Sequence, residues 1–200
     1  MTKDALRGAA RARRAELTRD HGRTAPLAAL ERLAASPLGD ALAEYGVFAG
    51  YVPIGSEFDP MPIMHHCLDL GLAGAVPVVR DRSAQSGAGP LEFQRWDPET
   101  ELAPGPFDVP VPRPSTATVI PDLLFVPLLA ADRQGWRIGY GAGYYDGALR
   151  ALRQGRGTVL AVGLCFAGQL IDAVPRHGGD ERLDWIVTET ELIETTAHRD

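Results

Sequence analysis

The chain has 200 residues, of which 45% are hydrophobic and 23% charged, and a formal net charge of −6. These values are ordinary for a globular protein and give enough chain for one hydrophobic core. The negative charge argues against a general nucleic-acid-binding protein, and no apolar run approaches the roughly 20 residues that span a bilayer. The N-terminus lacks the apolar stretch of a signal peptide, so we expect a cytoplasmic protein. Cys67 and Cys165 are far apart in the sequence, so we expect two reduced, buried cysteines.

The first half of the chain alternates helical and strand patterns. The elements expected there are helices at 2–20, 26–44 and 62–70 and strands at 47–52 and 75–79. The first helix places four basic residues on one stripe, namely Lys3, Arg7, Arg11 and Arg14. Such a stripe is usually a solvated face, but it would also suit a phosphate group.

The second half contains two continuous apolar runs, at 123–129 and 158–164, which are typical of strands inside parallel sheets. The other expected elements are a polar loop at 80–90, a strand at 91–96, a proline-rich extended segment at 98–121, a helix at 144–153, a short helical piece at 170–174 and a strand at 185–188. The proline-rich segment either carries a binding loop or simply crosses the surface.

This alternation of strands and helices predicts an α/β fold with three layers. We expect an open, mainly parallel, Rossmann-like sheet with helices on both faces. A single domain is expected over 1–194, followed by a flexible tail at 195–200.

A glycine-rich loop is the most informative local motif. Gly139, Gly141 and Gly143 lie between an apolar strand and a helix, with Arg137 before them and Asp146 after them. Strand, glycine loop and helix together bind phosphate, because the backbone can approach an anion and the helix N-terminus attracts it. The spacing fits neither a Walker A loop nor a dinucleotide fingerprint. A tight structural turn explains the glycines equally well.

The sequence supports two interpretations of Asp146 about equally. It falls in the first turn of the expected helix, where a carboxylate could hold Mg²⁺ against a polyphosphate. It could equally complement the helix dipole.

Three segments are expected to meet in one cleft, since ligands of open α/β sheets bind at the carboxyl ends of strands. They are the glycine loop, residues 53–59 and residues 167–169. Phosphates would lie at the glycine loop, with an organic substrate beside them.

Residues 127–146 resemble the signature of the 5-formyltetrahydrofolate cyclo-ligase family, also called methenyltetrahydrofolate synthetases. The other segments that resemble this family are 3–7, 51–59, 107–113, 161–169 and 183–189. The resemblance implies ATP-dependent conversion of 5-formyltetrahydrofolate to 5,10-methenyltetrahydrofolate, with ADP and phosphate released through a phosphorylated formyl intermediate. It implies a monomer that binds folate, ATP and Mg²⁺, with no nucleic-acid or membrane partner.

The resemblance also implies residue roles. Arg137 and Tyr145 would act in catalysis, and Asp146 and Asp180 would hold Mg²⁺, in part through water. ATP would be bound by Lys3, Arg7, Arg137, Ile138, Gly139, Tyr140, Gly141, Ala142, Gly143, Tyr144 and Tyr145. The folate would be bound by Val52, Glu57 and Tyr144. Without the resemblance, strand core is an equally good interpretation of Val52, and a surface loop position is the favoured interpretation of Glu57. Only one of Tyr144 and Tyr145 is expected to face the folate.

Three positions depart from the family pattern, namely Ala131, Gly147 and Gly179. They support an alternative in which the chain is a catalytically weakened relative that binds nucleotide or folate in a regulatory or storage role. A third reading is a sugar-phosphate or CoA-handling enzyme of similar topology, because fold does not fix function.

Overall fold

The computed structural model describes residues 2–79, 91–106, 109–113 and 116–195. Its helices are α1 (Lys3–His21), α2 (Ala25–Ala34), α3 (Pro37–Ala41), α4 (Met61–Asp69) and α5 (Tyr144–Arg156), with short 3-10 helices η1 (Leu42–Glu44) and η3 (Ala167–Gln169). Its strands are β1 (Val47–Ala49), β2 (Ala73–Val79), β3 (Leu91–Arg95), β4 (Leu102–Pro104), β5 (Pro110–Pro112), β6 (Thr118–Val119), β7 (Leu123–Pro127), β8 (Ala130–Ala131), β9 (Arg137–Ile138), β10 (Leu160–Leu164), β11 (Trp185–Val187) and β12 (Leu192–Glu194). The expected loop at 80–90 lies outside the described residues.

An eight-stranded sheet forms the centre of the protein, in the order β12-β11-β10-β7-β1-β2-β3-β6. The five strands from β11 to β2 are parallel, and β12, β3 and β6 join antiparallel at the two edges. The predicted α/β class and mainly parallel sheet are therefore confirmed. The antiparallel strand β12 was not predicted.

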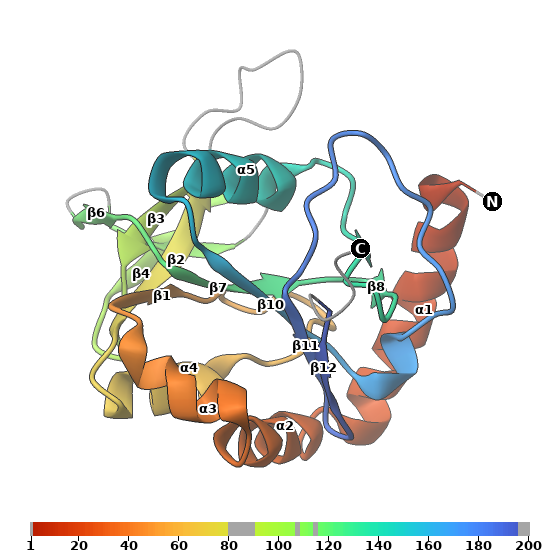
Figure 1. The fold of residues 1–200 in the computed structure, drawn as a ribbon, viewed down its shortest axis with the longest axis horizontal. Helices are drawn as coiled ribbons and strands as arrows, with labels where there is room; N and C mark the ends of the chain where they lie inside the picture. The colour runs from red at the N-terminus through yellow and green to blue at the C-terminus, as the bar shows by residue number, and fades with distance from the viewer. Residues whose placement is uncertain (1, 80–90, 107–108, 114–115, 196–200) are drawn as a thin grey trace.

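Helices cover both faces of this sheet, which confirms the three layers (Figure 1). Helices α2, α3 and α4 pack on one face, where buried Leu33 and Ile63 meet Phe48 and Phe125 of the sheet. Helix α5 covers the other face, where its Leu149 is fully buried. The apolar runs at β7 and β10 are buried because helices shield both of their faces.

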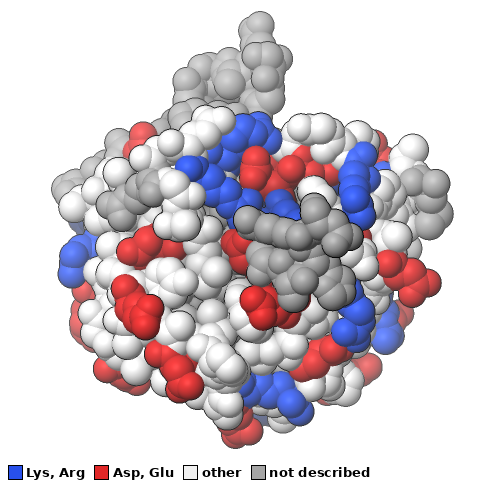
Figure 2. All heavy atoms as spheres, in the orientation of Figure 1, with Lys and Arg blue, Asp and Glu red and all other residues white. Residues whose placement is uncertain are grey.

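Charged side chains of both signs are interspersed over the face seen in Figure 2. Within the described part of the chain, none of the helices is both long and apolar enough to cross a membrane. Cys67 and Cys165 are free and buried, as predicted, and they belong to different core clusters.

Two predicted helices were wrong. The helix expected over 26–44 breaks at Ser36, which has extended backbone and accepts a hydrogen bond from Gly39 N to cap α3. Pro37 disfavours helical backbone at the residue before it, so the break follows from the Ser-Pro pair. Residues 170–174 are not helical, because Leu170 forms a parallel bridge to Ala131 and Ile171 N donates to the Ala131 carbonyl.

The C-terminal segment is partly described. Thr195, the first residue of the expected tail, is buried, and its backbone N–H donates to the Asp184 carbonyl at 3.0 Å. Residues 196–200 lie outside the described residues.

Gln169 joins the carboxyl ends of two neighbouring parallel strands. Its amide nitrogen donates to the carbonyls of Leu128 and Leu129, at 3.0 Å each, and its amide oxygen accepts from Phe166 N at 2.9 Å. The side chain is almost fully buried and is the side-chain partner of the Phe166 N–H and the Leu129 carbonyl, while the Leu128 carbonyl also accepts from Arg14 Nη1 at 3.4 Å.

We therefore expect Gln169→Ala to lower the free energy of unfolding by about 3 kcal/mol, because buried backbone groups lose their partners. Urea denaturation measures the change. The matched control is Gln134→Ala at an exposed position, which should leave stability within about 0.5 kcal/mol of the parent. Equal effects of both substitutions would contradict this role of Gln169.

Candidate active site

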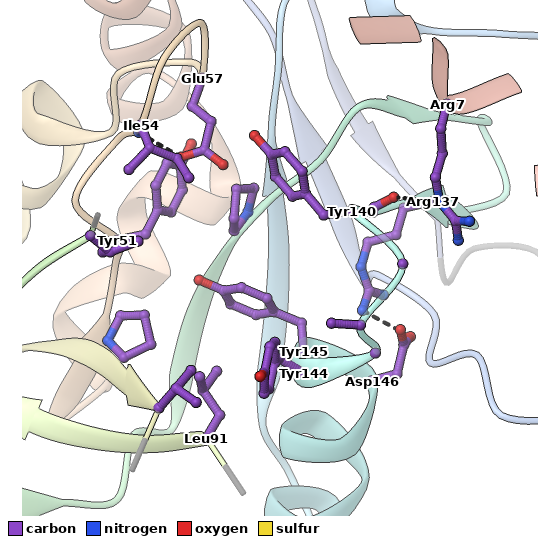
Figure 3. A pocket seen from close by; sticks show the side chains of 18 of the residues that line it. Arg7, Tyr51, Ile54, Glu57, Leu91, Arg137, Tyr140, Tyr144, Tyr145 and Asp146 are labelled. Atoms are coloured by element: carbon purple, nitrogen blue, oxygen red, sulfur yellow. Dashed lines mark hydrogen bonds and ion pairs between the residues drawn. The ribbon is translucent and has the colours of Figure 1, made fainter. Parts of the chain in front are cut away.

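A cavity of about 880 Å³ opens at the carboxyl edge of the parallel strands (Figure 3). It is bounded by the N-terminal end of α1, the segment after β1, and the glycine loop that leads into α5. The predicted site residues that line it are Lys3, Arg7, Val52, Glu57, Arg137, Gly139, Tyr140, Gly141, Ala142, Gly143, Tyr144, Tyr145, Asp146 and Asp180. The structure thus brings together residues from distant parts of the sequence.

Ile138 is the predicted site residue whose side chain does not reach the cavity. It is fully buried in a small cluster with Leu129, Ala130 and Val174. Since it precedes Gly139 in the chain, it anchors the start of the glycine loop to the core.

The glycine loop follows the short hairpin β8–β9, which was not predicted, instead of following β7 directly. Gly141 and Gly143 have positive φ values of 110° and 73°, which favour glycine. A Cβ on Gly141 would also lie only 3.2 Å from the Arg7 guanidinium carbon. Gly143 lines the cavity and is the N-cap of α5, so the first N–H groups of this helix have no side-chain cap.

Arg137 is buried between α5 and the segment before β11. Its guanidinium donates to Asp146 Oδ1 at 2.8 Å and to the Glu181 carbonyl at 2.5 Å. Burial lowers the pKa of Arg137, an effect opposed by Asp146 and Asp180. Arginine stays charged under these conditions, so a fixed cation lies beside the glycine loop.

Lys3 and Arg7 add positive charge from α1. Lys3 Nζ lies 2.7 Å from Asp180 Oδ2, and Arg7 Nε donates to the Gly139 carbonyl at 3.1 Å. Burial raises the pKa of Asp180, but its hydrogen bonds to Lys3 and to His177 N outweigh this effect and the pKa falls below its ordinary value. Asp180 is therefore held as a carboxylate beside Lys3.

The two candidate metal ligands each have a cationic partner, Arg137 for Asp146 and Lys3 for Asp180. Over the described ranges there is no group of three or more His, Cys, Asp or Glu side chains arranged to hold a metal ion. Mg²⁺ needs no such group when one or two carboxylates and substrate phosphates bind it, often with several waters. These aspartates therefore fit an ion that arrives with a phosphate.

Glu57 lies at the opposite end of the cavity and is only 8% exposed. Its Oε2 accepts a hydrogen bond from Ile54 N at 2.9 Å, and its Oε1 lies 3.9 Å from Arg14 Nη1. Burial raises the pKa of Glu57, whereas the Ile54 N–H, the Tyr140 hydroxyl and Arg14 oppose the rise. Glu57 is therefore a recessed acceptor inside the cavity.

Arg14 lies at the same end of the cavity as Glu57. Its place on the basic stripe of α1 had suggested a position beside a phosphate group instead. Its side chain is buried, and it donates to Ser56 Oγ at 3.2 Å and to the Tyr140 hydroxyl at 2.5 Å. A signal for burial exists in the sequence, because Arg14 falls on the same helical stripe as Leu6, Ala10 and Leu17.

Apolar side chains form the wall between the two ends. They are Tyr51, Val52, Ile54, Pro77, Val79, Leu91, Pro106, Val109, Val111 and Pro127. The β4–β5 hairpin contributes to this wall, so the proline-rich segment carries part of the cavity. The expectation that residues 167–169 join the cleft was wrong, since Gln169 is buried by its backbone contacts and Gly168 packs against Leu17.

Both Tyr144 and Tyr145 line the cavity, although only one was expected to face a ligand. Figure 3 shows the Tyr145 ring extending toward the side that carries Glu57 and Tyr51. Burial, and then the charge of Glu57, raise the pKa of Tyr145 well above its ordinary value. The Tyr145 hydroxyl therefore remains protonated and can donate a hydrogen bond.

The family model for 5-formyltetrahydrofolate cyclo-ligases matches residues 1–189. The chain belongs to this family. It is 32% identical over 141 residues to the 5-formyltetrahydrofolate cyclo-ligase of Mycolicibacterium smegmatis, covering 69% of this chain and 71% of that protein. It is 28% identical over 150 residues to the enzyme of the same name from Escherichia coli K12, covering 73% of this chain and 79% of that protein.

Solved structures agree with this membership. The NMR structure of Aquifex aeolicus 5,10-methenyltetrahydrofolate synthetase superposes with a TM-score of 0.76 at 26% identity, covering 100% of this chain and 94% of that chain. A 5,10-methenyltetrahydrofolate synthetase from Mycoplasma pneumoniae, at 20% identity and a TM-score of 0.70, covers 94% of this chain and 99% of that chain and supports the fold alone.

The raised pKa of Glu57 predicts a pH dependence. An ionised carboxylate accepts hydrogen bonds from a ligand, whereas a protonated one loses part of this capacity. A ligand that donates hydrogen bonds to Glu57, as the family resemblance implies for 5-formyltetrahydrofolate, should therefore lose affinity on acidification, beginning at a higher pH than the ordinary glutamate value of 4.5 implies. Glu57→Gln should remove this component, as calorimetric titration of both proteins between pH 7 and pH 4.5 would show. Parallel pH profiles for the two proteins would contradict the assignment.

Proposed function

We propose that this chain converts 5-formyltetrahydrofolate and ATP into 5,10-methenyltetrahydrofolate, ADP and phosphate. Besides family membership, one structural observation supports this proposal. A single cavity has fixed cations and a glycine loop at one end and a buried carboxylate behind an apolar wall at the other. Such a cavity fits a triphosphate beside a flat heterocycle.

The triphosphate is proposed to bind at the cationic end. Lys3, Arg7 and Arg137 supply positive charge, and the glycine loop and the first turn of α5 supply backbone N–H groups. Phosphoryl transfer depends mainly on positioning and on neutralisation of charge at the transferred group. The residues of this end provide both without a covalent intermediate on the protein.

The pterin ring is proposed to bind against Glu57, which can accept hydrogen bonds from the ring's amide and amine edge. Val52 and Ile54 would form the apolar wall, and the rings of Tyr144 and Tyr145 would stack on the folate. This pose directs the formyl group toward the glycine loop, because the two ends share one cavity.

The proposed reaction has two bond-forming steps. The formyl oxygen attacks the γ-phosphorus and ADP leaves, after which N10 attacks the activated carbon, loses its proton, and phosphate leaves. Arg137 and Lys3 would stabilise the charge on the transferred group, and the protonated Tyr145 hydroxyl would orient the formyl group. Asp146 and Asp180 would hold Mg²⁺, directly or through water; Mg²⁺ supplies charge neutralisation at the phosphates.

A non-catalytic role is not favoured. Ala131, the first departure from the family pattern, is buried and pairs with Arg137 in the β8–β9 hairpin. Despite the other two departures, Gly147 and Gly179, the segment that carries Asp180 still contacts α5. Arg150, one helical turn after Gly147, donates to the Gly179 carbonyl. The two candidate metal ligands therefore remain close to Arg137, as its electrostatic partners show.

Two substitutions should separate the two ends of the cavity. Arg137→Met should lower kcat/KM for ATP by roughly 100-fold, because a fixed cation at the transferred phosphoryl group is lost. Glu57→Gln should raise the KM for 5-formyltetrahydrofolate by roughly 10-fold to 100-fold, because bonds to an ionised acceptor are the strong ones. Steady-state kinetics with each substrate varied in turn measures both effects.

The matched control is Arg133→Met, which removes an exposed arginine that pairs with Glu191 on the surface. This variant should keep the parent kinetics with both substrates. The assignment of two separate ends is wrong if Arg137→Met and Glu57→Gln affect ATP and folate kinetics equally.

A further inference from the structure

Tyr140 extends from the glycine loop to the folate end of the cavity. It lies between Gly139 and Gly141, and Figure 3 shows its ring reaching away from the loop toward Glu57. Its hydroxyl accepts a hydrogen bond from Arg14 Nη2 at 2.5 Å, and Nη1 of the same guanidinium lies 3.9 Å from Glu57 Oε1. One side chain of the glycine loop is thus joined to Glu57 through Arg14.

Arg14 is a fixed point in this arrangement. Its guanidinium also contacts Ser56 Oγ and the Leu128 carbonyl, and its carbon lies 5.3 Å from the centroid of the Tyr140 ring. The side chain is only 4% exposed, so movement would leave a buried charge without partners. Arg14 therefore holds Tyr140 and Glu57 in a defined relation to each other.

The glycine loop itself has little side-chain mass to fix its conformation. Of its residues, Gly139, Gly141 and Gly143 have no Cβ, and Gly139 and Gly143 have open space where one would be. The Tyr140 side chain consequently decides much of how the loop is held relative to Glu57. Burial, and then the charge of Glu57, raise the pKa of Tyr140 to about 12, so its hydroxyl stays protonated while it accepts the bond from Arg14.

We propose that Arg14 and Tyr140 are positioning residues that couple the Glu57 carboxylate, at the folate end, to the glycine loop. Through this coupling each substrate increases the affinity of the protein for the other. The proposal rests on the proposed function, because it takes the two ligands to be folate and ATP. A folate bound to Glu57 fixes the Glu57 carboxylate, which through Arg14 orders Tyr140 and the loop. The nucleotide then binds to a loop that has already lost conformational freedom.

Linkage requires this effect to be reciprocal, which makes it measurable from either side. The test uses calorimetric titration of the intact protein with a non-hydrolysable ATP analogue and Mg²⁺, with and without saturating 5-formyltetrahydrofolate. The ratio of the two dissociation constants is the coupling factor. We expect a factor of about ten for the parent protein, within the usual range of allosteric coupling, and the same factor when folate is titrated instead.

Tyr140→Phe removes the hydroxyl and keeps the ring, so we expect its coupling factor to fall to about two or less. Arg14→Lys should lower the factor similarly, because an ammonium cannot reproduce the planar fork that contacts Tyr140 and Ser56 together. Thermal melts verify that each variant is folded. Because the readout is a ratio, a uniform loss of affinity through general damage would not change it.

Tyr51→Phe is the matched control. Tyr51 lines the same cavity, but its hydroxyl donates to the Phe58 carbonyl at 2.8 Å, on the folate side. This variant should keep the full coupling factor even if its folate affinity falls.

The coupling proposal is overturned if both ligands bind the parent protein with no coupling, or if folded Tyr140→Phe and Arg14→Lys keep the parent factor. Either result leaves the proposed function standing. Failure of the parent protein to bind either ligand alone or together would overturn the proposed function and the coupling with it.

Discussion

The ion pair between the buried Arg137 and the partly exposed Asp146 is the interaction on which the arrangement of the site depends. Arg137 comes from the β8–β9 hairpin and Asp146 from the first turn of α5, and the Glu181 N–H and carbonyl bind the same two side chains. Three separate segments are thereby joined behind the glycine loop. A buried charge is costly without partners, so these contacts also keep the cation in one place. A cation that does not reorganise is what phosphoryl transfer requires.

The rest of the cavity is organised by side chains that connect its ends. Lys3 joins α1 to Asp180, Arg7 joins α1 to the glycine loop, and Arg14 joins α1 to Tyr140 and Glu57. Helix α1 thus contacts both the proposed phosphate end and the proposed folate end through residues spaced along one stripe. An ATP-dependent ligase has to prevent hydrolysis of ATP when the second substrate is absent. A structure in which one helix and one tyrosine contact both ends suits that requirement.

Much of the fold could be predicted from local patterns, because the elements concerned have strong ones. The apolar runs at β7 and β10, the basic stripe of α1 and the three glycines each carry a clear signal. The β8–β9 hairpin could not be predicted, since its two-residue strands are too short for any periodicity. The error at 170–174 has a similar origin, because the bridge from Leu170 to Ala131 is a contact between distant parts of the chain.

Most residues of the candidate site could be predicted from the sequence, but the contacts between them could not. The resemblance to a family supplied residues that the cavity then brought together, with Ile138 the exception. The role of Arg14 was missed, because a basic residue on a basic stripe reads as solvated until the apolar residues beside it are considered. The apolar wall was largely missed for a different reason. Most of the members that were missed come from β2, β3 and the β4–β5 hairpin, which no local pattern places beside the glycine loop.

The most direct test of the account is the reaction itself. Purified protein would be incubated with 5-formyltetrahydrofolate, ATP and Mg²⁺, and the methenyl product followed by its absorbance while ADP is measured in parallel. The account predicts that product forms only when ATP is present, with one ADP released for each methenyl group formed. Folded protein that yields no product under these conditions, or that releases ADP without product, would contradict it.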